Sequence, residues 1–326
     1  MAIAEARAFA PSNIALCKYW GKRSVELNLP VNSSLSISLG NKGASTKVSL
    51  IDSNLDVVIL NNNQIDTQNN FYKKIVKFLD LFREQLPNKD TSFKIDTYSN
   101  IPIAAGLASS ACGFAALIKA LDQLFGWDLP AKNLSILARL GSGSACRSLF
   151  HGFVKWHSGV DEDGIDSFAE SLDLDWPDFC VGLLILDQKE KYLSSRDAMK
   201  LSVETSPLYA AWKGLSIRDL DTIESAIKNK DFPLLGQTAE ANALAMHAVM
   251  LSTRPAVMYS NSDTINNIQK IWQLRREHNI ELYFTQDAGP NLKLLFLSKD
   301  IARVKEFFPN VEIIEPFNVI GCGFNE

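Results

Sequence analysis

The segment Gln-Asp-Ala-Gly-Pro-Asn at 286–291 contains a carboxylate that could take part in chemistry. Asp, Gly, Pro and Asn all favour turns, so a purely structural aspartate is one interpretation. The alternative is that Asp287 lies at the end of a strand and faces cationic side chains. A carboxylate near Lys18 and Arg147 would have a lowered pKa and would be ionised at neutral pH. It could then act as a base or orient a hydroxyl group.

A group of cations lies close to the N-terminus, in Lys-Tyr-Trp-Gly-Lys-Arg at 18–23. Such a group could be no more than the solvated end of an edge strand. It could also hold an anion, because Lys22 supplies positive charge and the Tyr19 hydroxyl adds a directed hydrogen bond. Asn32 and Ser33, a few residues further on, could fix this clamp or contact a substrate.

The segment Gly-Ser-Gly-Ser-Ala-Cys-Arg-Ser at 141–148 combines hydroxyl groups, glycines and an arginine. A Gly-Ser turn that caps a helix is the ordinary explanation. Ser142, Gly143 and Ser144 could equally expose backbone and hydroxyl donors to an anion. Arg147 could then hold a carboxylate in a bidentate manner.

The other polar groups give weaker signals. Ser195 and Arg196, within Tyr-Leu-Ser-Ser-Arg-Asp-Ala-Met, form another donor group. The four histidines show no metal-ligand spacing with Cys or His partners, so we expect no protein-held metal and a structural role for His151, His157, His247 and His278.

The uncharged segment Ile-Pro-Ile-Ala-Ala-Gly-Leu-Ala-Ser-Ser-Ala-Cys-Gly at 101–113 could be a close-packed buried helix. It also follows a predicted strand and continues into a predicted helix, and the free N–H groups of a helix N-terminus bind phosphate well. Gly106 would let the backbone approach an anion, while Ser109 and Ser110 would add donors. The segment matches neither the Walker A nor the dinucleotide-binding pattern. Both interpretations therefore stay open from the residues alone.

Hydrophobic periodicity predicts the elements that must position these segments. Alternating residues predict strands at 34–39, at two places in 46–65, and at 92–99, 147–156, 179–187, 280–286 and 292–297. Helical spacing predicts helices at 71–86, 114–127 and 131–140, three across about 206–253, one starting at a Ser262 N-cap, and a short one before a last strand. A change of composition near 187–200 predicts two domains, 1–187 and 188–326.

The bulk composition is that of a globular protein, with 46% hydrophobic and 21% charged residues among 326. A net charge of −4 argues against a nucleic-acid partner, which would need a basic face. We expect no membrane span, because no apolar run reaches the ~20 residues that one requires. Five scattered cysteines and an N-terminus without a signal-peptide pattern predict reduced thiols and a cytoplasmic location.

Several of these segments resemble a known family. Pro-Ile-Ala-Ala-Gly-Leu-Ala-Ser-Ser-Ala resembles the phosphate loop of the GHMP kinase superfamily. Three further stretches resemble its diphosphomevalonate decarboxylase branch: APSNIALCKYWGKR with LPVNSSLS, GSGSACRS, and YFTQDAGPN. They occur in the family's order across about residues 7–297. Cys17 and Gln286 depart from the usual pattern, but neither removes a charged group.

The resemblance implies an α+β fold of two lobes, with an N-terminal ribosomal-S5-like lobe in 1–187 and a C-terminal ferredoxin-like lobe in 188–326. It implies ATP and Mg²⁺ as cofactors, mevalonate 5-diphosphate as a small-molecule substrate, and a homodimer. The substrate would be phosphorylated on its 3-hydroxyl, and loss of that phosphate with CO₂ would give isopentenyl diphosphate.

The resemblance also implies residue roles. Asp287 would meet the 3-hydroxyl, Lys18 would tune Asp287, and Arg147 with Ser144 would hold the substrate carboxylate. The diphosphate would be held by Tyr19, Lys22, Ser142, Gly143, Ser195 and Arg196. The ATP phosphates would be held by Ala105, Gly106, Leu107, Ala108, Ser109 and Ser110.

Three alternatives stay open. A relative could decarboxylate mevalonate 5-phosphate, or could stop after phosphorylation as a mevalonate 3-kinase. The chain could also be a non-catalytic ligand-binding relative, although such a protein would be expected to lose the carboxylate or the phosphate loop. Retention of Lys18, Arg147 and Asp287 favours the decarboxylase.

Overall fold

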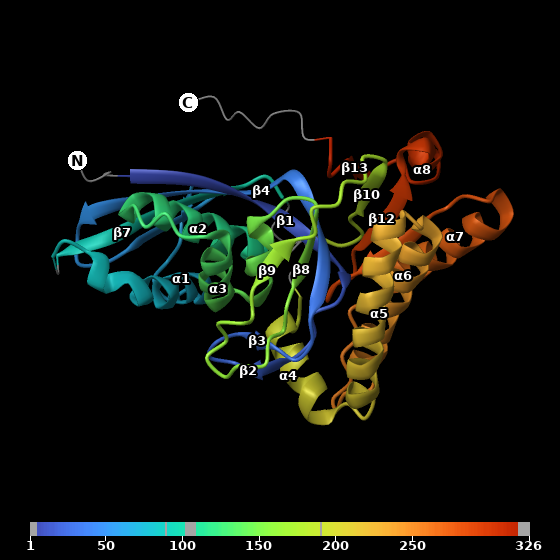
Figure 1. Cartoon of the computed structure of the whole chain (residues 1–326), viewed down its shortest axis with the longest axis horizontal. Coiled ribbons are helices and arrows are strands. Elements are labelled where there is room, and N and C mark those ends of the chain that lie inside the picture. The colour runs from blue at the N-terminus through green and yellow to red at the C-terminus, as the bar shows by residue number, and fades with distance from the viewer. Residues whose placement is uncertain (1–4, 89, 102–108, 190, 319–326) are drawn as a thin grey trace.

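The described residues form two large sheets, each with helices packed against it, and a two-stranded sheet (Figure 1). The computed structural model describes residues 5–88, 90–101, 109–189 and 191–318. The first sheet contains β1 (Glu5–Cys17), β4 (Ser34–Asp52), β5 (Val57–Leu60), β6 (Asn63–Gln64), β7 (Thr91–Ser99), β8 (Phe153–Trp156) and β9 (Ala169–Ser171). The helical elements of this half are α1 (Asn70–Leu79), η1 (Asp80–Gln85), α2 (Ser109–Phe125), α3 (Ala131–Gly141) and η2 (Gly143–Leu149). Strands β2 (Lys22–Ser24) and β3 (Leu29–Pro30) pair as a small hairpin.

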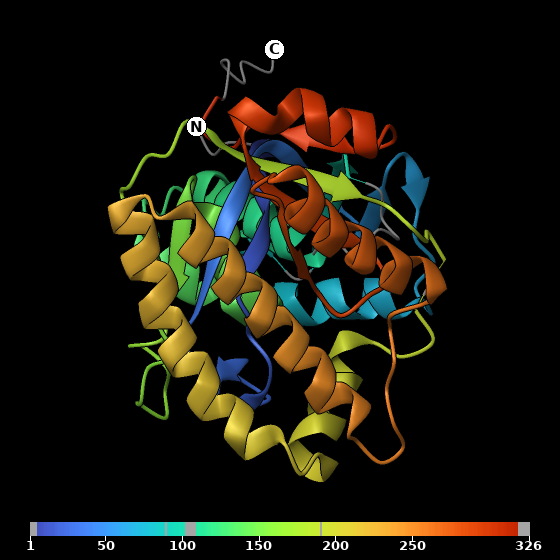
Figure 2. The same cartoon turned by 90° about the vertical axis from the view of Figure 1, so that its right-hand side faces the viewer.

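The second sheet is antiparallel, in the order β11-β12-β10-β13. Its strands are β10 (Phe179–Leu184), β11 (Tyr283–Gln286), β12 (Leu292–Leu297) and β13 (Glu312–Ile314). The helical elements of this half are α4 (Ser195–Thr205), α5 (Tyr209–Asn229), α6 (Phe232–Leu251), α7 (Ser262–His278), η3 (Ser298–Asp300) and α8 (Ile301–Phe307). Helices α5 and α6 lie side by side (Figure 2).

Strand β4 is the centre of the first sheet. It pairs with β1, with β7 through its second half, and with β8 through its first four residues. The register between β1 and β4 shifts between Pro11 and Asn13 and again between Ala15 and Cys17. Such bulges change the direction of side chains and are common next to functional sites. Close pairing at the first bulge needs Gly43, because a Cβ there would lie 2.1 Å from the Ala10 carbonyl oxygen.

One hydrophobic core joins the two halves. Ile14, Leu35 and Ile37 of the first sheet belong to the same buried cluster as Val181 and Leu295 of the second sheet. Helices α5 and α6 contribute to this cluster as well. The end of β1 is therefore packed against the second half of the chain.

The structure differs from the predicted elements in several places. The strand predicted at 34–39 and the first of those predicted in 46–65 form the single strand β4, and the helix predicted over 71–86 ends at Leu79 and is followed by η1. The strand predicted over 147–156 is wrong for its first part, because Gly143–Leu149 form the 3₁₀-helix η2 and β8 starts only at Phe153. The N-cap of α7 is Asn261, whose side chain accepts from the Thr264 N–H in a capping box, so Ser262 is already inside the helix. Only α5 and α6 lie within 206–253, and the third helix, α4, lies in the polar stretch before them.

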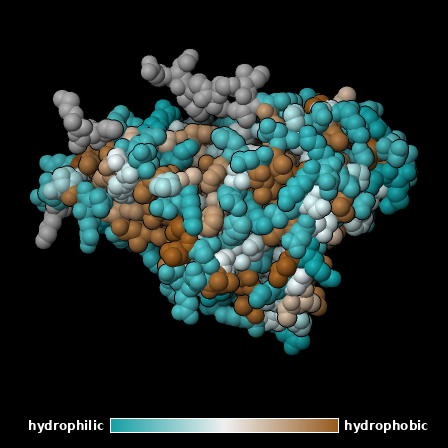
Figure 3. Space-filling view, viewed as in Figure 1, coloured by the Kyte–Doolittle hydropathy of each residue, from teal (hydrophilic) through white to brown (hydrophobic). Residues whose placement is uncertain are grey.

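One face of the molecule shows how its hydrophobic side chains are distributed. Hydrophobic side chains on the face seen in Figure 3 form scattered groups on a mostly hydrophilic background. None of the helices in the described ranges is both long and apolar enough to cross a bilayer.

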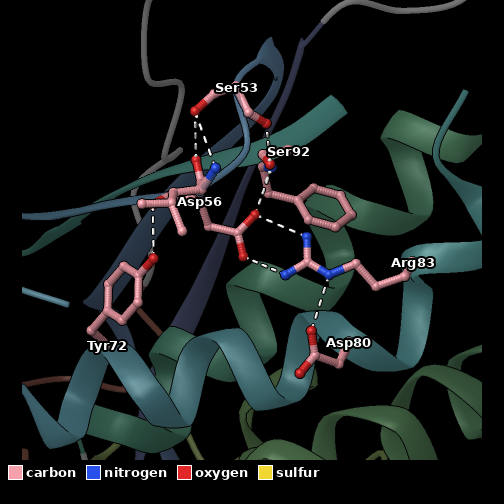
Figure 4. A network of polar contacts seen from close by, with 8 residues as sticks. Ser53, Asp56, Tyr72, Asp80, Arg83 and Ser92 are labelled. Carbon is pink, nitrogen blue, oxygen red and sulfur yellow. Dashed lines mark hydrogen bonds and ion pairs between the residues drawn. The ribbon is translucent and has the colours of Figure 1, made fainter. Parts of the chain in front are cut away.

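An ion pair between the buried Asp56 and the partly exposed Arg83 lies beside the first sheet (Figure 4). Both oxygens of Asp56 accept from Arg83, at 3.0 and 2.5 Å, and Oδ1 also accepts from the Phe93 N–H at 2.9 Å. The Tyr72 hydroxyl donates to the Asp56 carbonyl at 3.0 Å. The network thus ties the chain before β5 to α1, η1 and β7, far in sequence from the segments predicted to do chemistry.

We expect Asp56→Ala to lower the free energy of unfolding by ~2–4 kcal/mol, because it leaves a buried N–H and a guanidinium without their acceptor. Urea unfolding measures the change. Asp80→Ala is the control. The Asp80 side chain, which also pairs with Arg83, is 56% exposed, so we expect this variant to lose at most about 1 kcal/mol of unfolding free energy. Equal losses in the two variants would contradict the assignment of a stabilising role to Asp56.

Candidate active site

Asp287 directly follows β11 and lies between two buried lysines. Lys18 Nζ lies 2.7 Å from Asp287 Oδ1, and Lys293 Nζ lies 3.1 Å from Oδ2. Both lysine side chains are 2% exposed, whereas the Asp287 side chain is 26% exposed. The two ammonium groups are thus enclosed, and the Asp287 side chain stays partly accessible.

The alternation of β12 places Lys293 at this position. Leu292, Leu294 and Phe296 pack in the core with α7 and α8, whereas Leu295 packs in the core shared with the first sheet. Because side chains alternate along a strand, Lys293 lies on the same face as Leu295. Its ammonium group therefore points toward the end of β1, where Lys18 lies.

Charge decides the ionisation state of the carboxylate. Burial by itself raises the pKa of Asp287, but the nearby Lys18 and Lys293 ammonium groups outweigh burial and lower that pKa well below its usual range. Asp287 is consequently ionised at neutral pH. Burial lowers the pKa of Lys18, and the carboxylate opposes this effect.

The backbone around Lys18 is held by side chains from distant elements. Its N–H donates to Asn242 Oδ1 of α6 at 2.8 Å, and its carbonyl accepts from Asn32 Nδ2 at 2.8 Å. The ammonium group also donates to the Ala15 carbonyl at 2.8 Å. Asn32, which the sequence suggested as a residue that fixes the clamp, therefore supports the main chain of Lys18.

The turn that carries Asp287 is fixed on several sides. Gln286 Nε2 donates to the Gly289 carbonyl at 2.8 Å and to Ser260 Oγ at 3.0 Å. Asn291 Oδ1 accepts from the backbone N–H groups of Leu186 and Asp187 at 2.6 and 2.9 Å. The unusual Gln286 thus closes the turn, and the final Asn joins the turn to the chain after β10.

His247 of α6 holds the same turn from a third side. Its Nε2 donates to the Asp287 carbonyl at 3.1 Å, since a carbonyl can only accept. Burial lowers the pKa of His247 to about 4, so the ring is neutral near pH 7. The sequence predicted a structural role for this histidine, and in the structure it supports the backbone of Asp287.

Arg147 is buried in η2 and points toward the first sheet. Its Nη1 donates to Ser34 Oγ at 2.6 Å and its Nε to Asn13 Oδ1 at 3.2 Å, and its guanidinium lies over the Trp156 ring at 5.7 Å. Asn13 is the residue that follows the first bulge in β1. Arg147 interacts electrostatically with Asp287 but forms no hydrogen bond with it in the described part of the chain. The guanidinium is therefore oriented by neutral partners, and its charge remains uncompensated by a direct ion pair there.

A second group of cations is linked to Tyr19 through Arg196, which interacts electrostatically with the tyrosine. Lys22, Lys74 and Arg196 lie close enough to influence one another electrostatically. Burial, followed by repulsion from Arg196, lowers the pKa of Lys22 and the pKa of Lys74 to about 8. The Tyr19 hydroxyl is buried without a hydrogen-bond partner among the described residues, and a Cβ on Gly143 would lie 3.0 Å from it. This arrangement suits a polyanion, which would supply both an acceptor for the hydroxyl and negative charge.

The serine-rich segments meet at the start of α2. Ser110 Oγ and Ser142 Oγ are 3.4 Å apart, and Ser142 is the C-cap of α3. Ser109 is the first residue of α2. The predicted phosphate-loop residues Ala105, Gly106, Leu107 and Ala108 lie outside the described residues.

Two further predicted residues, Ser144 and Ser195, contact side chains that interact with Arg147 or Asp287. Asn13 Nδ2 donates to the Ser144 carbonyl at 3.4 Å, which ties Ser144 to the Arg147 group. Ser195 starts α4 after the Ser194 N-cap, and its hydroxyl accepts from Lys191 Nζ at 3.4 Å. Lys191 also interacts electrostatically with Lys293 and Asp287. The structure therefore brings Lys18, Arg147 and Asp287 into one group, and Tyr19, Lys22 and Arg196 into an adjacent one.

Sequence reasoning missed several members of these groups. Lys293 had a readable signal, since it is a lysine inside an otherwise apolar strand, Leu-Lys-Leu-Leu-Phe-Leu. Lys74 and Lys191 had none, because lysines in a helix or a polar loop are usually solvated. Asn13 and Ser34 carry no charge, and only their contacts with Arg147 reveal them. Within the described ranges, no group of three or more His, Cys, Asp or Glu side chains is placed to hold a metal ion.

Comparison with known proteins identifies the class. Residues 10–169 match the model of the diphosphomevalonate decarboxylase-like N-terminal domain, and residues 181–318 match that of the mevalonate 5-diphosphate decarboxylase C-terminal domain. The chain therefore belongs to the diphosphomevalonate decarboxylase family, a family of ATP-dependent carboxy-lyases.

Individual relatives agree with this membership. The chain is 37% identical over 310 residues to diphosphomevalonate decarboxylase of Aspergillus fumigatus, covering 89% of this chain and 76% of that one. It is 36% identical over 311 residues to the Homo sapiens diphosphomevalonate decarboxylase, covering 90% and 77%.

Solved structures agree as well. Mevalonate diphosphate decarboxylase from Staphylococcus aureus superposes with a TM-score of 0.88 at 34% identity, covering 96% of this chain and 95% of the other. The enzyme from Enterococcus faecalis gives 0.85 at 38% identity, covering 95% and 96%. A structure of MDDEF in complex with MVAPP, AMPPCP and magnesium gives 0.84 at 38% identity, covering 96% and 99%. The α+β GHMP kinase fold expected from the sequence is thereby confirmed.

We expect inorganic pyrophosphate to bind more weakly at pH 9 than at pH 7. Lys22 and Lys74 have a pKa of about 8, so both lose positive charge as the pH rises through that value. Pyrophosphate itself gains negative charge over this range, so a loss of affinity has to come from the protein. Calorimetric titration at the two pH values measures it.

The double variant Lys22→Met/Lys74→Met should bind weakly at both pH values. Lys200→Met, at a lysine that is 73% exposed, should behave like the unaltered protein. A pH dependence that persists unchanged in the double variant would show that other groups hold the anion.

Proposed function

We propose that this protein catalyses the ATP-dependent decarboxylation of mevalonate 5-diphosphate to isopentenyl diphosphate, ADP, phosphate and CO₂, a step of isoprenoid biosynthesis in the mevalonate pathway. Family membership over nearly the whole chain supports the reaction. The observation that carries the proposal is the partly exposed Asp287 carboxylate, held ionised among Lys18, Lys293 and Arg147.

Asp287 is proposed to accept the hydrogen bond of the substrate 3-hydroxyl while ATP transfers its γ-phosphoryl group to that oxygen. A carboxylate whose pKa is held so low is a weak base in the resting enzyme. Its arrangement therefore supports orientation of the hydroxyl and stabilisation of the positive charge that develops on the hydroxyl oxygen as the P–O bond forms. The proton passes to Asp287 once the new P–O bond reduces the basicity of the substrate oxygen.

Arg147 is proposed to hold the substrate carboxylate with Ser144. When the C–O bond to the new phosphate breaks, the electron pair of the C–C bond to the carboxylate forms the double bond, and CO₂ leaves. A guanidinium that is already oriented by Ser34 and Asn13 loses little freedom on binding, which supports this role. Lys18 is proposed to tune Asp287, because its ammonium group keeps the carboxylate ionised.

The second group of cations, with Tyr19, supports the assignment of a diphosphate as part of the substrate. Among the described residues, these cations have no carboxylate partner and the Tyr19 hydroxyl has no hydrogen-bond partner, which suits a diphosphate. The proposed contacts are those of Tyr19, Lys22, Ser142, Gly143, Ser195 and Arg196. The free N–H groups at the start of α2 suit the ATP phosphates, with Ser110 as a hydroxyl donor, and Ala105 to Ser109 complete the proposed loop. Mg²⁺ would neutralise negative charge during phosphoryl transfer, and the Ser110 hydroxyl at the start of α2 is an oxygen donor of the type that it prefers.

Three further statements stay predictions. One is the division into domains 1–187 and 188–326. Strand β10 (Phe179–Leu184) lies before this boundary but pairs with β12 and β13 of the second sheet. The homodimer and the cytoplasmic location are the others.

The test of the reaction is parallel measurement of ADP and CO₂ with Mg²⁺–ATP and each of mevalonate, its 5-phosphate and its 5-diphosphate. Equal amounts of ADP and CO₂ with the diphosphate are expected. ADP without CO₂ would instead identify a kinase, and a preference for the monophosphate would reassign the group around Tyr19.

Asp287→Asn should reduce kcat by at least ~10²-fold while substrate binding stays largely intact, because the amide keeps the shape but not the charge. Steady-state kinetics gives both values. Asp263→Asn, at an exposed position in α7, is the control and should retain normal turnover. Near-normal turnover in Asp287→Asn would remove Asp287 from the mechanism.

A further inference from the structure

Lys293 occupies a position where an apolar residue would be expected. Its neighbours along β12 are all hydrophobic, and its partners across the sheet are Leu183 on β10 and Thr285 on β11. The Thr285 hydroxyl donates to the Ala15 carbonyl at 3.2 Å, and the Lys18 ammonium donates to the same carbonyl. Lys293 therefore lies where the second sheet contacts the end of β1.

The two lysines hold opposite oxygens of one carboxylate. With Lys18 on Oδ1 and Lys293 on Oδ2, rotation of the carboxylate about its Cβ–Cγ bond would break at least one ion pair. A carboxylate has about four acceptor sites, so two remain for other donors. Because 26% of the side chain is exposed, a remaining site is accessible to a ligand hydroxyl.

Stability does not explain a buried lysine here. Removing an ammonium group from water is costly, and apolar residues at such sites are often equally stable or more so. The carboxylate also has a sufficient partner in Lys18. The second lysine is better explained by what it does to the orientation and charge of Asp287.

We propose that Lys293 is a positioning residue, which holds Oδ2 of Asp287 opposite Lys18 and so fixes the carboxylate in the orientation that receives the substrate hydroxyl. The proposal rests on the proposed function of Asp287 and adds a second lysine to it. Lys293 does not contact the reacting atoms in this role; it acts through Asp287.

Several other charged or titratable groups surround Asp287 and contribute to its pKa. Lys18 approaches from the end of β1, Lys191 from the chain before α4, Arg147 from η2 and His247 from α6. In Lys293→Met the carboxylate loses one cation while its burial remains, so its pKa rises toward the usual range and its ionised fraction falls at acid pH. In the unaltered enzyme Asp287 stays ionised throughout the working range.

The experiment compares kcat and KM of Lys293→Met with those of the unaltered enzyme at about pH 8 and about pH 5. We expect kcat to fall by ~10–100-fold at the higher pH, with a much smaller change in KM, because the hydroxyl is bound but poorly oriented. The ratio of variant to unaltered kcat should fall further at the lower pH. Titration of the substrate phosphates affects both enzymes equally and cancels in this ratio.

Three variants separate positioning from a structural role. Lys293→Arg keeps the charge and should show a kcat ratio that does not depend on pH. Lys155→Met removes a partly buried pair with Glu224 and should show near-normal kcat. Lys293→Gln keeps a donor without the charge and replaces Lys293→Met in the comparison if the latter does not fold in a thermal unfolding assay.

Two outcomes would overturn the proposal: kcat of the neutral variant equal to that of the unaltered enzyme, or a loss of kcat that is the same at both pH values and accompanies a lower melting temperature. Either result concerns Lys293 alone. Absence of ATP-dependent CO₂ release by the unaltered enzyme would instead reject the proposed function.

Discussion

Buried positive charge needs a negative partner, and this requirement governs the candidate active site. Lys18, Lys293 and Arg147 are all buried around the carboxylate of Asp287. One carboxylate cannot balance three cations, so the site carries an excess of positive charge before any ligand arrives. A substrate with a carboxylate and a diphosphate, together with ATP, would supply several negative charges to balance this excess.

The packing between the two sheets keeps these charges in place. β1 brings Lys18, β12 brings Lys293, and the turn after β11 brings Asp287, and all three elements meet at a core built from both halves of the chain. Amide side chains perform the local alignment, since Asn32 and Asn242 hold the backbone of Lys18 and Gln286 closes the turn of Asp287. The apolar core and hydrogen bonds from neutral side chains thus hold the charged groups in a fixed arrangement.

The fold could be predicted in part. The strand at 292–297 agrees with β12 to the residue, and the helix that ends near Gly141 is α3, because these segments have strong periodicity and clear terminal residues. The stretch 147–156 could not be predicted, since its apolar residues suit a strand but Arg147 must turn back toward Ser34, which a 3₁₀-helix permits. The helix start at Asn261 was also ambiguous, because Asn261 and Ser262 are both good N-caps and only the Thr264 contacts distinguish them.

The sequence by itself determined which chemical groups the protein has available: a carboxylate in a turn, cations beside an aromatic pair, and serine-rich segments at helix ends. Their types and order were sufficient to indicate the family. Tertiary structure alone decided which groups meet. Lys293 lies six residues from Asp287 in the chain, but Lys18 lies 269 residues away, and both contact the same carboxylate. Local patterns report periodicity and turn preference, whereas the pairing of charges depends on how sheets pack, and packing is a property of the whole core.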